Sequence, residues 1–72
     1  MDVDVTENPD LHRFEIRLDG ELAGFVAYRP VNGALAFTHA EVDPARRGAG
    51  VAARLVAGAF ELVRAAGGRV RP

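Results

Sequence analysis

The residues with the clearest chemical pattern lie in one segment, 43–52, which reads Asp-Pro-Ala-Arg-Arg-Gly-Ala-Gly-Val-Ala. Arg46 and Arg47 precede two glycines, and a helical pattern of apolar residues starts at Val51. A helix start has unpaired N–H groups and a partial positive charge, so it attracts anions. Most helices place an acidic residue there, but positions 45–54 hold three arginines and no acid. The pattern favours a diphosphate site.

A steric explanation of the same segment stays open. Glycine-rich turns between a strand and a helix are common, and Arg46 and Arg47 could simply be solvated. Two other phosphate motifs are excluded. No Lys-Ser/Thr pair follows the glycines, as the nucleotide P-loop requires. The dinucleotide fingerprint needs three spaced glycines after a parallel strand, and the spacing here differs.

Residues 13–42, which precede this segment, predict three antiparallel strands. Apolar residues alternate with charged ones over 13–18, which is the period of a half-buried strand. Asp19-Gly20 and Asn32-Gly33 are typical hairpin turns. The strands are expected at 13–18, at 21–29 with Pro30 as its end, and at 34–42. Residues 3–6 predict a fourth strand, followed by a turn at Asn8-Pro9-Asp10.

The period changes after this meander. Apolar residues recur at helical spacing from Val51 to Val63, and Gly67-Gly68 gives the helix a natural end. Residues 69–71 resemble the start of a further strand. The sequence therefore predicts an α+β fold: an antiparallel meander of three to four strands, one long helix after the loop, and a short final strand. Phe14, Phe25, Phe37 and Phe60 are the expected core aromatics.

The third strand carries the candidate catalytic residues. His39 and Glu41 lie two apart, so they share a strand face, and the alternation adds Leu35 and Phe37 to that face. Histidine is the usual general base near neutral pH. A histidine packed under the helix is the alternative, and Glu41 could be an exposed strand end. Tyr28 could donate a proton, although tyrosines at this place in a sheet mostly pack.

Composition limits the function classes. The chain has 72 residues, 10 acidic and 9 basic side chains, a net charge of −1 and no cysteine. We expect one small domain over 1–72, without disulfides, thiolate zinc sites or any other metal site. The charge argues against nucleic-acid binding. Residues 1–8 do not resemble a signal peptide, and the longest apolar stretch, 55–60, is too short to span a bilayer. A cytoplasmic protein without a membrane partner is the expectation.

The series Arg47-x-x-Gly50-x-Ala52 resembles the acyl-CoA diphosphate motif of the GNAT superfamily of N-acetyltransferases. The similarity to the small, stand-alone branch of that superfamily extends over nearly the whole chain, and it rests on Arg13-Phe14-Glu15, Asp19-Gly20, Ala23-Gly24-Phe25, Tyr28-Arg29, Phe37-Thr38-His39, and Glu41-Val42 with Pro44. The resemblance implies a minimal three-layer GNAT-like fold in which the third strand and the final strand splay apart. Acetyl-CoA would bind there, with pantetheine along the main chain near Glu41 and Val42. The cofactor-binding residues would be Val42, Arg46, Arg47, Gly48, Ala49, Gly50, Val51 and Ala52.

The resemblance implies transfer of an acetyl group to a primary amine, in a small molecule or peptide that the sequence does not identify. His39 and Glu41 are then the candidate catalytic residues. In the small branch, a cysteine-containing segment follows the final strand, and this chain has no such segment. We therefore expect a domain that is incomplete at its C-terminus. The alternative function is a CoA-binding or interaction module without catalysis, and the edge of the final strand could form a homodimer.

Overall fold

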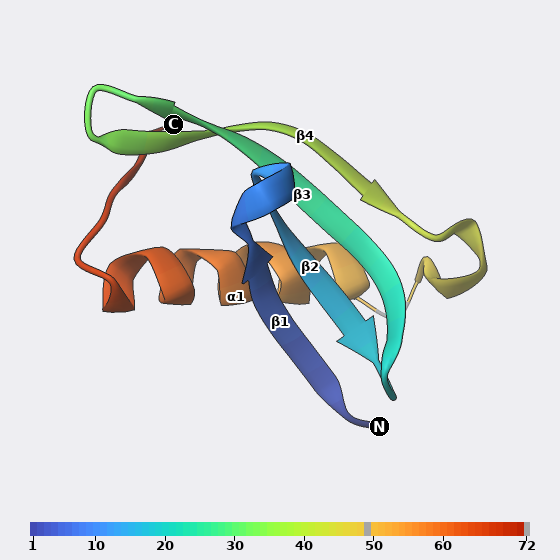
Figure 1. The fold of residues 1–72 in the computed structure, drawn as a ribbon. Helices are drawn as coiled ribbons and strands as arrows, with labels where there is room; N and C mark the ends of the chain where they lie inside the picture. The colour runs from blue at the N-terminus through green and yellow to red at the C-terminus, as the bar shows by residue number, and fades with distance from the viewer. Residues whose placement is uncertain (49, 72) are drawn as a thin grey trace.

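The computed structural model describes residues 1–48 and 50–71. It contains a five-stranded sheet of order β1-β2-β3-β4-β5, in which β1 to β4 are antiparallel and β5 is parallel to β4. One helix crosses one face of this sheet (Figure 1). The elements are β1 (Val3–Asn8), η1 (Pro9–Leu11), β2 (Arg13–Leu18), β3 (Glu21–Val31), β4 (Ala34–Val42), η2 (Pro44–Arg46), α1 (Val51–Ala65) and β5 (Val70–Arg71). The predicted α+β fold is confirmed.

Short-range signals placed the turns correctly. Asp19 and Gly20 have φ values of 51° and 85°, and Asn32 and Gly33 have values of 50° and 79°. Positive φ at both central residues matches the right-handed twist of the flanking strands. The fourth strand, β1, is confirmed as well. Asn8 caps η1 by accepting a hydrogen bond of 3.3 Å from the N–H of Leu11.

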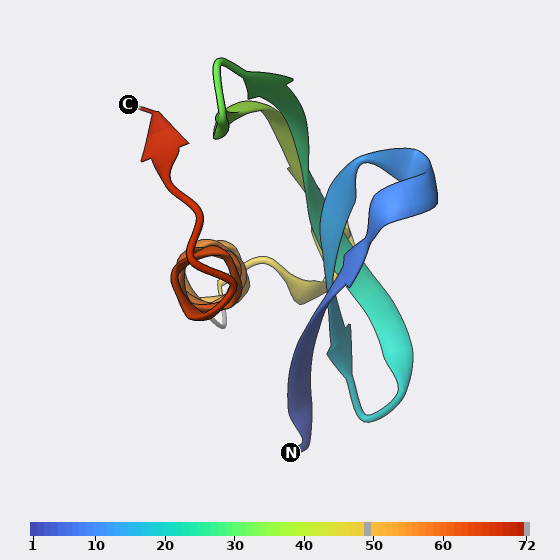
Figure 2. The same cartoon turned by 60° about the vertical axis from the view of Figure 1, so that its left-hand side comes forward.

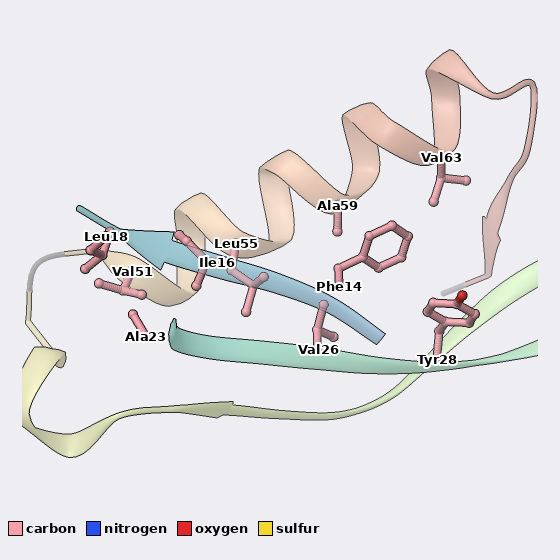
Figure 3. Packing of buried hydrophobic residues seen from close by; sticks show 10 residues of the cluster. All are labelled: Phe14, Ile16, Leu18, Ala23, Val26, Tyr28, Val51, Leu55, Ala59 and Val63. Carbon is pink, nitrogen blue, oxygen red and sulfur yellow. The ribbon is translucent and has the colours of Figure 1, made fainter. Parts of the chain in front are cut away.

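The hydrophobic core lies between α1 and the sheet. Helix residues at a spacing of four point to the sheet and are buried, as Figure 3 shows, and these are Val51, Leu55, Ala59 and Val63. Phe14, Ile16 and Leu18 of β2 meet them from the sheet side. Figure 2 shows the helix nearly end-on beside one face of the sheet, and no described element covers the other face. We call this uncovered side the open face.

The helix approaches β1 closely at Gly58. A Cβ atom at Gly58 would lie 2.7 Å from Cγ2 of Val5, which is closer than real Cβ contacts. Glycine inside a helix costs about 1 kcal/mol relative to alanine. The close approach accounts for a glycine at this position.

Three expectations about apolar positions were wrong. Phe25 is not a core residue, because its ring lies beside Arg13 on the open face and outside the core cluster. Pro30 does not end its strand, because β3 continues to Val31 and Pro30 pairs with Leu35. Beyond Tyr28, β2 has no residue left to pair with β3, so the missing N–H of Pro30 breaks no ladder bond there. Phe60 is not a core residue, since it is 45% exposed and its ring lies beside Phe37 at a centroid distance of 5.4 Å.

The β3–β4 ladder contains a bulge that sequence alternation does not show. Ala27 pairs with His39 and Tyr28 pairs with Phe37, so Thr38 is an extra residue on β4. Phe37 stays on the helix side, where its ring meets Phe14 and Phe60. After the bulge, the faces of β4 are exchanged relative to simple alternation from Phe37.

Candidate functional site

The segment between β4 and α1 is held by its own local bonds. Asp43 accepts a hydrogen bond of 3.1 Å from the N–H of Ala45, which caps η2. Gly48 and Gly50 have φ values of 94° and 69°, a region that strains other residues. These two glycines turn the chain into the helix at Val51. The strand-to-helix loop predicted from the sequence therefore exists as expected.

At the start of α1, no side chain of the helix competes with a bound anion for the backbone N–H groups. Gly50 is the N-cap residue and provides no side-chain cap, and the first turn contains no acidic residue. The first backbone bond of the helix runs from the N–H of Arg54 to the carbonyl of Gly50, at 3.0 Å. The N–H groups of the three preceding residues have no partner within the helix. Those residues, 51–53, line a pocket of about 450 Å³.

The same pocket includes most of the predicted cofactor residues. Its lining consists of Val42, Arg47, Gly48, Gly50, Val51, Ala52 and Ala53. Arg47 is exposed and forms no ion pair within the described residues. Arg46 does not line the pocket, because its Nη2 lies 2.7 Å from Oε1 of Glu21 on β3. Ala49, the remaining predicted residue, lies outside the described residues.

Next to this pocket, β4 has an unpaired edge. The ladder between β4 and β5 comprises only the pairs Leu35–Val70 and Ala36–Arg71. In the described part of the chain, no strand pairs with this edge of β4 from Phe37 onward. A free strand edge offers main-chain N–H and carbonyl groups to an extended ligand. The edge ends at Val42, which is also the strand residue of the pocket.

His39 and Glu41 share a face, as predicted, but it is the open face rather than that of Leu35 and Phe37. The Thr38 bulge is the reason for this difference, because the extra residue shifts the alternation of side chains along β4 by one position. Nε2 of His39 lies 2.9 Å from Oε2 of Glu41. Their side chains are 59% and 64% exposed, so the expectation of a histidine packed under the helix is wrong.

Residues 13–72 match the family described as GCN5-related N-acetyl-transferase. The chain belongs to this family. The match covers β2 to β4, the glycine loop, the helix and the final strand, and it includes every residue that lines the pocket. A comparison with curated proteins finds no match.

Membership of this acetyltransferase family indicates acetyl transfer as the general chemistry. The family transfers acetyl groups, and its members generally use acetyl-CoA. Among the described residues, no three His, Asp or Glu side chains come together in a group that could hold a metal ion. No helix in the described ranges has the length and apolar character that crossing a membrane requires.

Tyr28 of this acetyltransferase-family chain packs rather than facing the pocket. It is 7% exposed, and its hydroxyl donates a hydrogen bond to Oε2 of Glu7 on β1. Burial, and then this bond to Glu7, raises the pKa of Tyr28 to about 12. His12 is exposed, and its ring stacks on Tyr28 at a centroid distance of 5.6 Å. The phenol therefore stays protonated near neutral pH.

A charged cluster on the open face was not predicted from the sequence. Glu15 is only 5% exposed, and its carboxylate accepts bonds from Arg13 (2.8 Å), Arg17 (3.0 Å) and Asn8 (3.2 Å). Burial by itself raises the pKa of Glu15, but these hydrogen bonds outweigh it, and the net pKa lies below the usual 4.5. The alternation Arg13-Glu15-Arg17 was the available signal, because it places three charges on one strand face.

Proposed function

We propose that this chain binds acetyl-CoA through the 450 Å³ pocket and transfers the acetyl group to a primary amine. The supporting observation is the start of α1, where uncapped N–H groups, Gly48 and Gly50 surround one pocket together with Arg47, which has no ion-pair partner among the described residues. A diphosphate needs such donors and a backbone without obstructing side chains. Membership of the acetyltransferase family agrees with this assignment.

Different residues of the loop would have different roles in binding acetyl-CoA. The N–H groups of residues 51–53 would hold the diphosphate, and Arg47 would add a charge-assisted hydrogen bond. Arg46 would support the loop indirectly, because it ties η2 to Glu21. The pantetheine arm would follow the free edge of β4 from Val42 towards the Thr38 bulge.

The residues of β4 would support the transfer step. Acetyl-CoA, when bound, supplies an acetyl group activated as a thioester. The amine nitrogen forms a bond to the thioester carbonyl carbon, and the carbon–sulfur bond breaks. His39 would accept the proton that the amine nitrogen loses, and the CoA thiolate leaves with the electron pair of the broken bond. Glu41 would orient the imidazole through its 2.9 Å contact.

Calorimetric titration of acetyl-CoA into the purified chain tests binding. We expect saturable, stoichiometric binding that desulfo-CoA competes away. Arg47→Ala should weaken it by about 1–3 kcal/mol, because a charge-assisted contact is lost. Arg64→Ala is the matched control, since Arg64 is exposed at the far end of α1 and pairs with Glu61 at 2.7 Å. A folded wild-type chain that does not bind acetyl-CoA would overturn the proposal.

Thiol release in the presence of an amine panel tests transfer. Because the chain contains no cysteine, a thiol reagent reports only free CoA. Amine-dependent CoA release above the uncatalysed rate is the expected result. Binding without any release across the panel would instead favour a CoA-binding protein without turnover.

A further inference from the structure

The open face contains a buried carboxylate that no covering element explains. Glu15 lies on β2 between Phe14 and Ile16, which face α1, so its side chain is on the other side of the sheet and yet is 5% exposed. The side chains of Arg13 and Arg17 shield it, with side-chain exposures of 23% and 38%. Burying a charge costs free energy, and replacing a buried ion pair with well-packed apolar residues often leaves a protein equally stable. The arrangement fixes two guanidinium groups in defined positions.

Both guanidinium groups keep donors for a ligand. Arg13 uses Nε for Glu15 and Arg17 uses Nη1. In the described ranges, no hydrogen bond engages their other N–H groups. Two arginines share one glutamate, and Asp4 of β1 lies opposite Arg17 on the same face. Held guanidinium groups with free N–H donors fit a carboxylate, which accepts such bonds in pairs.

The strand register connects this cluster to the proposed base. Arg13 pairs with Ala27, and Ala27 pairs with His39, so the three residues form one row across the sheet. Adjacent strands are about 4.8 Å apart, which places the ends of this row roughly 10 Å apart. The residue between them is alanine, so no large side chain separates Arg13 from His39 within this row.

The neighbouring row provides an aromatic contact between the two ends. Glu15 pairs with Phe25, and Phe25 pairs with Glu41. Arg13 lies over the Phe25 ring at 4.6 Å, and the His39 ring is 6.0 Å from the same ring. Phe25 therefore lies next to both ends of the first row, Arg13 and His39.

We infer that the acceptor is a primary amine that also carries a carboxylate. Its amine lies at His39 and Glu41, and its carboxylate lies at Arg13 and Arg17. The inference rests on the proposed function, and it adds a substrate class to it. The charges are complementary, because the ammonium end of such a molecule meets Glu41 and the anionic end meets the arginine pair.

Acceptor pairs that differ only in the carboxylate test this inference. We would compare 4-aminobutyrate, 5-aminovalerate and 6-aminohexanoate with their amides in the CoA-release assay. We expect at least one acid to have a kcat/KM about tenfold above that of its amide. Arg17→Gln should raise the KM for that acid by about tenfold and leave kcat and the KM for the amide unchanged. Arg64→Gln, an exposed arginine of α1 on the other side of the sheet, is the control and should change neither.

A second variant and a binding measurement guard against loss of folding. Arg13→Lys keeps a charge beside Glu15 but loses the fork, so it should also raise the KM for the acid. Nitrogen-15 NMR of the arginine Nε–H groups should show Arg13 and Arg17 signals moving with 5-aminovalerate and not with its amide. Amides that equal the acids, or a preference for acids that survives in both variants, would overturn the inference.

Failure of the acceptor inference can be distinguished from failure of the proposed function. If acetyl-CoA binds while the Arg13 and Arg17 signals stay unmoved by 5-aminovalerate, the acceptor inference fails and the proposed cofactor site stands. If acetyl-CoA does not bind, the proposed function fails. In that case, absence of the NMR response also refutes the carboxylate site, and its presence supports that site independently of catalysis.

Discussion

Phe37 and His39 are two residues apart on β4, yet their side chains lie on opposite faces of the sheet. Phe37 packs against Phe60 of α1, whereas His39 lies beside Phe25 on the open face. The extra residue of the bulge, Thr38, separates them. This relationship exposes His39 and brings it into one row with Arg13.

His39→Gln should lower kcat for acetyl transfer by about 10²-fold or more, because a general base is lost. Acetyl-CoA affinity should stay unchanged, since His39 does not line the pocket. The melting temperature should also stay close to that of the wild type, because the side chain is 59% exposed. Steady-state kinetics, calorimetry and thermal melts check these three points. A large loss of thermal stability with unchanged kcat would assign His39 a packing role.

Gly50→Val should abolish saturable acetyl-CoA binding. A Cβ at Gly50 meets no atom within 4 Å, so the new side chain enters the pocket instead of clashing with the protein. The positive φ also adds backbone strain of about 1–3 kcal/mol. Gly20→Val is the matched control, because Gly20 has a φ of +85°, equally open surroundings and a place in a remote hairpin. Equal calorimetric affinities for the two variants would contradict the role of Gly50.

Ultraviolet titration should give Tyr28 a midpoint of about 12. It is the chain's single tyrosine, so the phenolate absorbance reports this residue alone. Because its pKa rises from 10.0 on folding, protonated Tyr28 contributes stability that is fully present below pH 10 and is lost as pH rises through 12. Urea unfolding should show this loss.

Glu7→Gln is the companion variant for that titration. Burial is the larger cause of the raised pKa and the bond to Glu7 is the smaller one. The midpoint should therefore fall in the variant but remain above 10.0. A midpoint unchanged by Glu7→Gln would show that the Tyr28–Glu7 bond has no effect in solution.

Gly58→Ala should destabilise the protein even though alanine favours helices by about 1 kcal/mol. The new Cβ would lie 2.7 Å from Cγ2 of Val5 and would push α1 away from β1. In a Val5→Ala background, the same substitution should be neutral or stabilising. A double-mutant cycle of urea unfolding measures this coupling. Additive effects of the two substitutions would contradict a direct contact between Val5 and Gly58.

Local features of the sequence were enough to predict the elements of this fold. Asp19-Gly20 and Asn32-Gly33 form turns because their backbones accept positive φ, whatever the rest of the chain does. The helix limits follow from apolar spacing and from the glycines after Ala65. The candidate diphosphate loop belongs to the same class, since its glycines, its arginines and its lack of acids all lie within one short segment.

Only the tertiary structure decided which side chains meet. Arg46 was expected at the cofactor, but its guanidinium pairs with Glu21, which is 25 residues away in the sequence. The side chain of His39 faces away from the helix because a bulge depends on pairing between two strands, and alternation within one strand does not encode it. Apolar periodicity identifies the face of a helix, but whether Phe60 is covered depends on what lies opposite. These properties are set by contacts between distant segments, so the sequence alone determined the elements and the loop, while packing decided their partners.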